Sequence, residues 1–141
     1  MRTVPSEHRE AFARYIAAPS DLRQALAGSD RTRLGQPGPD GWSVRGLMLH
    51  LADSEVVAGH ALRSILGGDE EIPETDIDGW DRRLGYMWRD AEAALALFRI
   101  LRFSNAELLQ HADNPAWKRR SRRGSALLGP ADILNESVAH C

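Results

Sequence analysis

Apolar residues recur about every 3.6 positions in the segment after Ser43, and this spacing constrains the fold more than any other feature. The residues that repeat are Leu47, Leu51, Ala58, Leu62 and Ile65. Serine is a favoured helix N-cap and glycine commonly ends a helix, so Ser43 and Gly67-Gly68 predict one long helix over 43–66. No segment alternates apolar and polar residues for long enough to build a sheet, so we expect an all-α chain.

Two more long or medium helices are expected, one before and one after the helix over 43–66 in the sequence. Residues 6–17 place Phe12, Tyr15 and Ile16 on one side of a first helix, and Pro19 either breaks this helix or starts a second piece. Asp90 is a cap for a helix that carries its own apolar stripe. The stripe consists of Ala91, Ala94, Leu95, Phe98, Leu101 and Leu108.

The last helix is expected to be short. It opens at Gly129-Pro130, because proline suits the first helical position, and it extends to Cys141. A short helix is also expected around Trp80, within the connection 69–86. Together these elements predict an up-and-down four-helix bundle in a single domain, residues 1–141, whose fourth helix is truncated.

The composition is that of an ordinary globular protein from a reducing compartment. A chain of 141 residues can bury a core without metal or disulfide staples, and the single cysteine, Cys141, excludes a disulfide framework. No apolar run approaches the length of a membrane span, and the N-terminus lacks the apolar core of a signal peptide. We therefore expect a cytoplasmic protein without a membrane partner.

Two segments concentrate opposite charges. Residues 118–123 carry five basic side chains, and residues 69–81 carry seven acidic ones. The basic run is compatible with a nucleic-acid patch, but the net charge of −2 and the lack of interleaved aromatic residues favour a solvated loop. We expect no nucleic-acid partner, and we expect the two segments to attract each other, within one molecule or across a dimer.

His50 lies beside the apolar stripe of the helix over 43–66, stacked with Leu47 and Ser54. An imidazole in that position needs a partner, because burying an unpaired polar group costs free energy. Two interpretations remain open. His50 is either a core histidine with a hydrogen-bond partner or a metal ligand, since imidazole is the commonest metal-binding side chain. In both cases we expect it to point inward.

The run Gly-Trp-Ser-Val-Arg at 41–45, followed by His-Leu-Ala-Asp-Ser-Glu at 50–55, resembles the first-ligand segment of the DinB/YfiT-like superfamily. Members of this superfamily are four-helix-bundle proteins that carry a three-histidine metal site. The resemblance extends over nearly the whole chain. Its other segments are Ile72-Pro73, Asp78-Gly79-Trp80, Leu84-Gly85-Tyr86, Ala94-Leu95-Ala96-Leu97-Phe98-Arg99, Asp132-Ile133-Leu134 and Ala139-His140.

The resemblance implies that His50 and His140 are metal ligands. In the family two ligands come from the last helix as His-x-x-x-His; His140 matches the first, and the second would fall at position 144, after Cys141. His60 lies about 15 Å along the helix from His50, so the two cannot share an ion. Glu136 is a conceivable substitute ligand, but we favour its interpretation as a solvated helix residue.

The resemblance also implies a metal-dependent enzyme of the DinB family, either a thiol transferase or a hydrolase. The cofactor would be a divalent transition metal, zinc or nickel, which lowers the pKa of water or of a low-molecular-weight thiol and acts on a small-molecule substrate. Two ligands hold an ion poorly, so the alternative is a metal-free helical module for protein interaction or small-ligand binding.

A homodimer is expected as well. Relatives commonly pair their bundles through helix faces, and a short fourth helix leaves apolar surface on the second and third helices.

Overall fold

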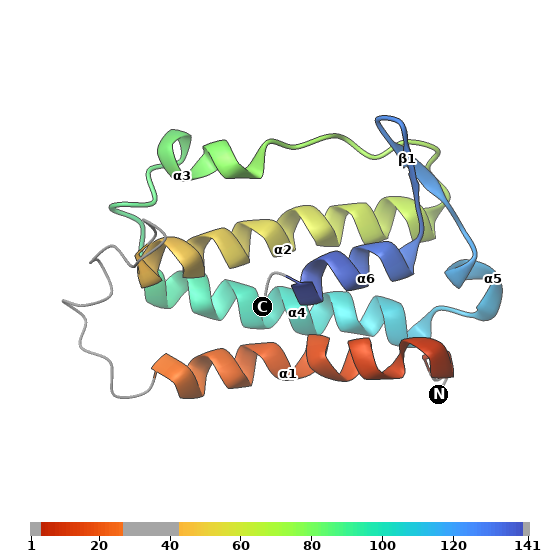
Figure 1. The fold of residues 1–141 in the computed structure, drawn as a ribbon, viewed down its shortest axis with the longest axis horizontal. Helices are drawn as coiled ribbons and strands as arrows, with labels where there is room; N and C mark the ends of the chain where they lie inside the picture. Colours follow the sequence, from red (N-terminus) through yellow and green to blue (C-terminus); the bar gives the residue numbers. More distant parts are fainter. Residues whose placement is uncertain (1–3, 27–42, 140–141) are drawn as a thin grey trace.

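The computed structural model describes residues 4–26 and 43–139 (Figure 1). Its helices are η1 (Ser6–His8), α1 (Arg9–Leu26), α2 (Val44–Gly67), η3 (Ile77–Gly79), α3 (Trp80–Arg83), α4 (Ala91–His111), α5 (Asn114–Trp117) and α6 (Pro130–Ala139). Two strands, β1 (Ser121–Arg123) and β2 (Ala126–Leu128), form an antiparallel hairpin. Helices α1, α2, α4 and α6 pack together, which confirms the predicted four-helix bundle (Figure 1).

The order of the helices around the bundle differs from the simple up-and-down arrangement that we expected. Helices α1 and α2 each pack against both α4 and α6. Helices α2 and α4 lie side by side and run in the same direction, while α1 and α6 run the opposite way (Figure 1). This is possible because the connection over 69–90 is long enough to return along the bundle before α4 begins.

Local capping sets the ends of the two longest helices as predicted. The Ser43 hydroxyl accepts a hydrogen bond from the Gly46 amide at 2.9 Å at the start of α2. Gly68 ends α2 in the left-handed region, with φ of 89°. At the start of α4, the Asp90 carboxylate accepts from the Glu92 amide at 2.8 Å.

Helix α1 continues through Pro19, so the expectation that this proline breaks the helix or starts a new piece was wrong. Proline has no amide hydrogen, and the Tyr15 carbonyl four residues earlier therefore loses its helical donor. The guanidinium Nη1 of Arg102 in α4 donates to that carbonyl at 2.9 Å. A tertiary contact thus replaces the missing helical hydrogen bond, which the local sequence does not reveal.

The buried side of α2 includes residues outside its predicted stripe, among them Met48, Leu49 and Ala52. Leu62 and Ile65 are buried as expected, whereas Leu47 is 41% exposed. Gly59 is buried in α2, and a Cβ there would lie 2.7 Å from the side chain of Asn105 in α4. Within the described part of the chain, no helix combines the length and the apolar character that a membrane span requires.

The hairpin corrects our expectation that the chain contains no sheet. Each strand has three residues, which is too short for an alternating pattern to be recognised. Gly124 occupies the left-handed region in the turn, with φ of 62°, where glycine is strongly favoured.

Strand β1 lies against the acidic connection that follows α2. The Arg122 amide donates to the Glu70 carbonyl at 2.8 Å, and the Ile72 amide donates to the Arg122 carbonyl at 2.7 Å. The Arg122 guanidinium also pairs with the Glu71 carboxylate at 3.1 Å. These contacts confirm the predicted attraction between the basic and acidic segments and place it within one molecule.

Candidate functional site

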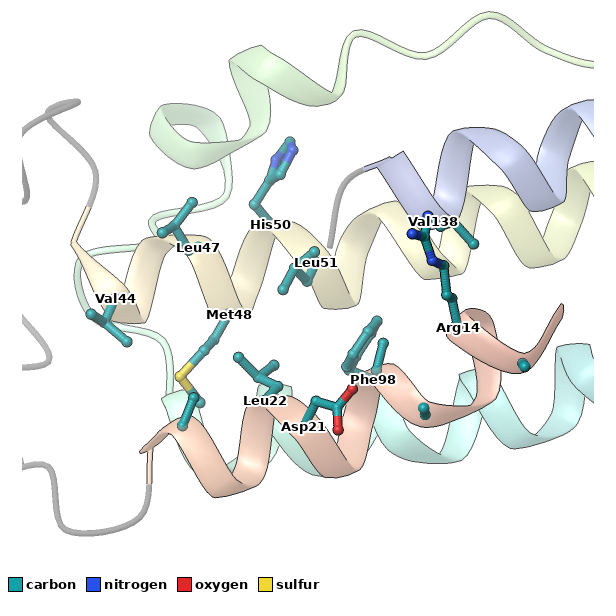
Figure 2. A pocket seen from close by; sticks show the side chains of 14 residues that line it. Arg14, Asp21, Leu22, Val44, Leu47, Met48, His50, Leu51, Phe98 and Val138 are labelled. Carbon is teal, nitrogen blue, oxygen red and sulfur yellow. The ribbon is translucent and has the colours of Figure 1, made fainter. Parts of the chain in front are cut away.

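A cleft of about 790 Å³ lies between α1 and α2 (Figure 2). Helix α1 contributes mainly alanines, and α2 contributes larger apolar side chains such as Met48 and Leu51. Phe98 of α4 and Val138 of α6 complete the lining. Of the fourteen lining residues in the part of the chain that the structure describes, three are polar, namely Arg14, Asp21 and His50. A cavity of this size and character suits a small apolar molecule.

His50 lies at the rim of this cleft and is half-buried. In Figure 2 its imidazole points away from Leu22 and Met48, toward the side of α2 on which α3 lies. The residue is therefore neither in the apolar core nor in bulk solvent. Its place on α2 puts it at the edge of the cleft, while its imidazole faces the side from which α3 covers this helix (Figure 2).

Deeper in the bundle, four polar side chains from three helices meet in what we term the buried polar junction: Tyr15, Glu55, Arg102 and Asn105. The Glu55 carboxylate accepts from Arg102 Nε at 3.0 Å, from Asn105 Nδ2 at 2.8 Å and from the Tyr15 hydroxyl. The Arg102 guanidinium also stacks over the Tyr15 ring, 3.9 Å from its centroid. Buried charges of opposite sign are thus paired and hydrogen-bonded, as their burial requires.

The environment of the junction keeps Tyr15 protonated. Burial has the largest effect, followed by the charge and the hydrogen bond of Glu55, and together they raise the pKa of Tyr15 well above its usual range. A tyrosine that stays neutral remains a hydrogen-bond donor to the carboxylate. The junction therefore has the character of a structural lock between α1, α2 and α4.

A second polar cluster lies on α2, one turn after His50. Asp53 is buried, and its carboxylate accepts from the Tyr86 hydroxyl at 2.7 Å and from both terminal nitrogens of Arg89, at 2.8 and 3.3 Å. Burial, and then the hydrogen bond to Asp53, raise the pKa of Tyr86 above its usual range. The cluster fixes the segment that leads into α4 against the helix that carries His50.

Sequence reasoning missed both clusters. Asp53 and Glu55 belong to the run that resembles the family segment, but a carboxylate in a helix is usually solvated, and nothing local shows its burial. Arg102 gave a weak signal, because it lies on the buried side of α4 between Phe98 and Leu109. A lone arginine on such a side needs an acidic partner, and only the packing of α2 against α4 identifies Glu55.

The structure places one of the two predicted metal ligands. His50 is at the cleft rim, while His140 lies outside the described residues. Over residues 4–26 and 43–139, no three or more His, Cys, Asp or Glu side chains gather in a way that could hold an ion. His60 is exposed on α2, away from the cleft lining, as its distance along the helix predicted.

Comparison with known proteins identifies the family. The family model described as the DinB superfamily matches residues 14–141. The chain belongs to the DinB superfamily. No curated protein sequence is similar enough to this DinB-superfamily chain to count as a match.

Among solved structures, the fold is similar to YfiT from Bacillus subtilis, described as "a probable metal-dependent hydrolase with an unusual four-helix bundle topology". The TM-score is 0.86 at 22% sequence identity, and the alignment covers 99% of this chain and 83% of YfiT. At this identity the likeness establishes the fold. It agrees with the resemblance seen in the sequence.

Proposed function

We propose that this DinB-superfamily chain is a metal-dependent hydrolase that acts on a small molecule, with His50 as a ligand of the ion. The observation that carries the proposal is the position of His50, half-buried at the rim of a cleft large enough for such a molecule. Membership of the superfamily and the description of YfiT support the same reaction class.

The described residues by themselves do not complete a metal site. They supply His50, and the second proposed ligand, His140, lies outside them. Catalytic zinc sites normally use three protein ligands and keep one open position. When bound, zinc or nickel would make water or a thiol more acidic. Of the proposed site, the described residues supply the proposed ligand His50 and the apolar wall beside it.

Metal content of protein purified without chelator tests the proposal. We expect bound transition metal in the unchanged protein and its loss in His50→Ala, with helicity nearly unchanged. His60→Ala is the matched control, because it removes an exposed histidine from the same helix, and it should keep the metal. Less than about a tenth of an equivalent, with no uptake on addition, would overturn the proposal.

Two finer alternatives share this site. Thiol transfer would use a low-molecular-weight thiol in place of water, and turnover that depends on added thiol would identify it. The second alternative is a metal-free binding module, in which His50 belongs to the cleft wall and holds no ion. In that case His50→Ala would leave metal content at zero and would act only on stability or ligand binding.

We also propose that the protein is a homodimer that pairs through the outward face of α4. Leu97, Ile100 and Phe103 lie there at three-residue spacing and are 37%, 60% and 70% exposed. Because the spacing is symmetric about Ile100, a two-fold axis at that residue would bring Leu97 of one copy onto Phe103 of the other. Phe103→Glu should shift sedimentation toward the monomer, whereas a monomer in the unchanged protein would refute the dimer.

A further inference from the structure

We propose that the cleft between α1 and α2 binds the apolar part of the substrate. The substrate class is then a small molecule with an uncharged hydrocarbon body and one polar, reacting group at the His50 rim. The inference rests on the proposed function for the identity of the reacting end. The binding of a hydrocarbon body by the cleft can be measured separately.

The walls of the cleft indicate an apolar ligand. Helix α1 lines the cleft at three positions with short side chains, those of Ala13, Ala17 and Ala18. Open space therefore remains between α1 and α2. On the α2 side Met48 is 4% exposed and lines the cleft with an adaptable thioether side chain. Phe98 of α4, which is 1% exposed, also belongs to the lining. Transfer of a hydrocarbon body from water to such a surface is favourable.

The polar groups of the lining limit the charge of the ligand. Arg14 and Asp21 carry opposite charges on α1, two helical turns apart, so together they add no net charge to the described lining. Both are exposed, which keeps them solvated. Among the described lining residues the remaining polar one is His50, on the opposite wall. A ligand with an uncharged body and a single polar end at the edge of the cleft beside His50 matches this distribution (Figure 2).

A small molecule fits the cleft better than a second copy of the chain does. Its volume of about 790 Å³ lies in the range of small-molecule sites. Side chains from α1, α2, α4 and α6 all take part in its lining, so it is walled on several sides. Ile100 and Phe103, the side chains proposed above to pair with a second copy, are 60% and 70% exposed on α4 and do not line the cleft.

Binding of the neutral fluorophore N-phenyl-1-naphthylamine tests the inference. The unchanged protein, stripped of metal with EDTA, should bind the probe with a saturable rise in fluorescence. Ala17→Trp fills the cleft from an exposed helical position and should weaken binding about tenfold or more. Ala93→Trp is the matched control, because Ala93 is an exposed alanine on α4 outside the lining, and it should bind within about twofold.

A further variant keeps the result decisive. Leu47→Gln puts a polar group into the α2 wall at a residue that is already 41% exposed, so it should weaken binding of the probe without unfolding the protein. Saturable probe binding by a protein that never takes up metal would separate the two proposals, because the cleft would then bind a hydrocarbon body although the proposed metal function had failed.

The inference is overturned if the unchanged protein shows no saturable binding. It is also overturned if Ala17→Trp and Leu47→Gln bind as well as Ala93→Trp does. If Ala17→Trp instead converts a dimer to a monomer in sedimentation, the occupant of the cleft is a second copy, and the small-molecule assignment is wrong.

Discussion

Along α1 and α2 the buried polar junction and the apolar cleft lie next to each other. Tyr15 and Glu55 belong to the junction, whereas Ala18 and Leu51 belong to the cleft. In the junction the helices are held together by paired charges and hydrogen bonds among buried atoms. In the cleft the same two helices stand apart and present apolar side chains to open space.

This contrast suggests that the junction contributes mainly to stability and the cleft mainly to binding. The junction contains strongly polar groups that lose water on folding, so it is stable only when all partners are present. The cleft has apolar lining that the described part of the fold leaves open, and such surface favours binding of an apolar ligand. Changes in the junction should therefore affect unfolding, and changes in the cleft should affect binding.

The largest effect is expected from Arg102→Ala. It leaves the buried Glu55 carboxylate without its ionic partner and the Tyr15 carbonyl without a donor. We expect a loss of about 3–5 kcal/mol in the free energy of unfolding, measured by urea denaturation. The control Arg99→Ala, one turn earlier on the exposed side of α4, should change it by less than about 0.5 kcal/mol. Similar losses of unfolding free energy in Arg102→Ala and Arg99→Ala would show that the buried polar junction contributes no special stability.

A smaller effect is expected from Asp53→Asn. The amide keeps the shape of the side chain but loses the charge that holds Arg89, whose side chain is 27% exposed. We expect a loss of about 1–3 kcal/mol in the free energy of unfolding, with probe binding in the cleft unchanged. Asp78→Asn, in an exposed position of η3, is the control. If the Asp53→Asn protein were fully stable but no longer bound the probe, the Asp53 cluster would contribute to binding in the cleft and not to stability.

The smallest effect concerns alkaline pH. The chain has two tyrosines, and the folded state raises the pKa of both. Above about pH 10 tyrosine ionises in the unfolded chain but not in the folded one, so the folded state binds more protons and stability falls as pH rises. The slope is at most about 1.4 kcal/mol per pH unit for one buried tyrosine.

Tyr15→Phe should flatten this decline between pH 10 and 12, at the cost of about 1 kcal/mol at neutral pH for the lost hydrogen bond to Glu55. Denaturation midpoints across that pH range measure it. Probe binding in the cleft should not follow the tyrosine titration, because neither tyrosine lines the cleft. An unchanged slope in Tyr15→Phe would place the alkaline sensitivity elsewhere.

Much of the local structure was predictable because its causes are local. Ser43, Gly68 and Asp90 act on the backbone within a few residues of themselves, so the ends of α2 and the start of α4 followed from the sequence. Pro19 failed as a helix breaker because its effect depends on Arg102, more than eighty residues away. The hairpin was missed because three-residue strands leave no periodic signal.

The candidate site likewise has a part that the sequence predicted and a part that it did not. His50 could be selected from the sequence because a histidine beside an apolar stripe has few explanations and because its neighbours resemble a family segment. The cleft could not be predicted, since its volume depends on the distance between α1 and α2. Leu47 was expected in the core, but it is partly exposed and lines the cleft instead.

By itself the sequence determined the helical class, the ends of its longest helices, the family and the candidate ligand His50, because periodicity, capping and residue type act over short distances. The tertiary structure decided that α2 and α4 run in parallel, that Glu55 and Arg102 meet in the core, and that an apolar cleft opens beside His50. These features depend on which helix surfaces come together, and pairwise contacts between residues about fifty positions apart leave no pattern in a single sequence.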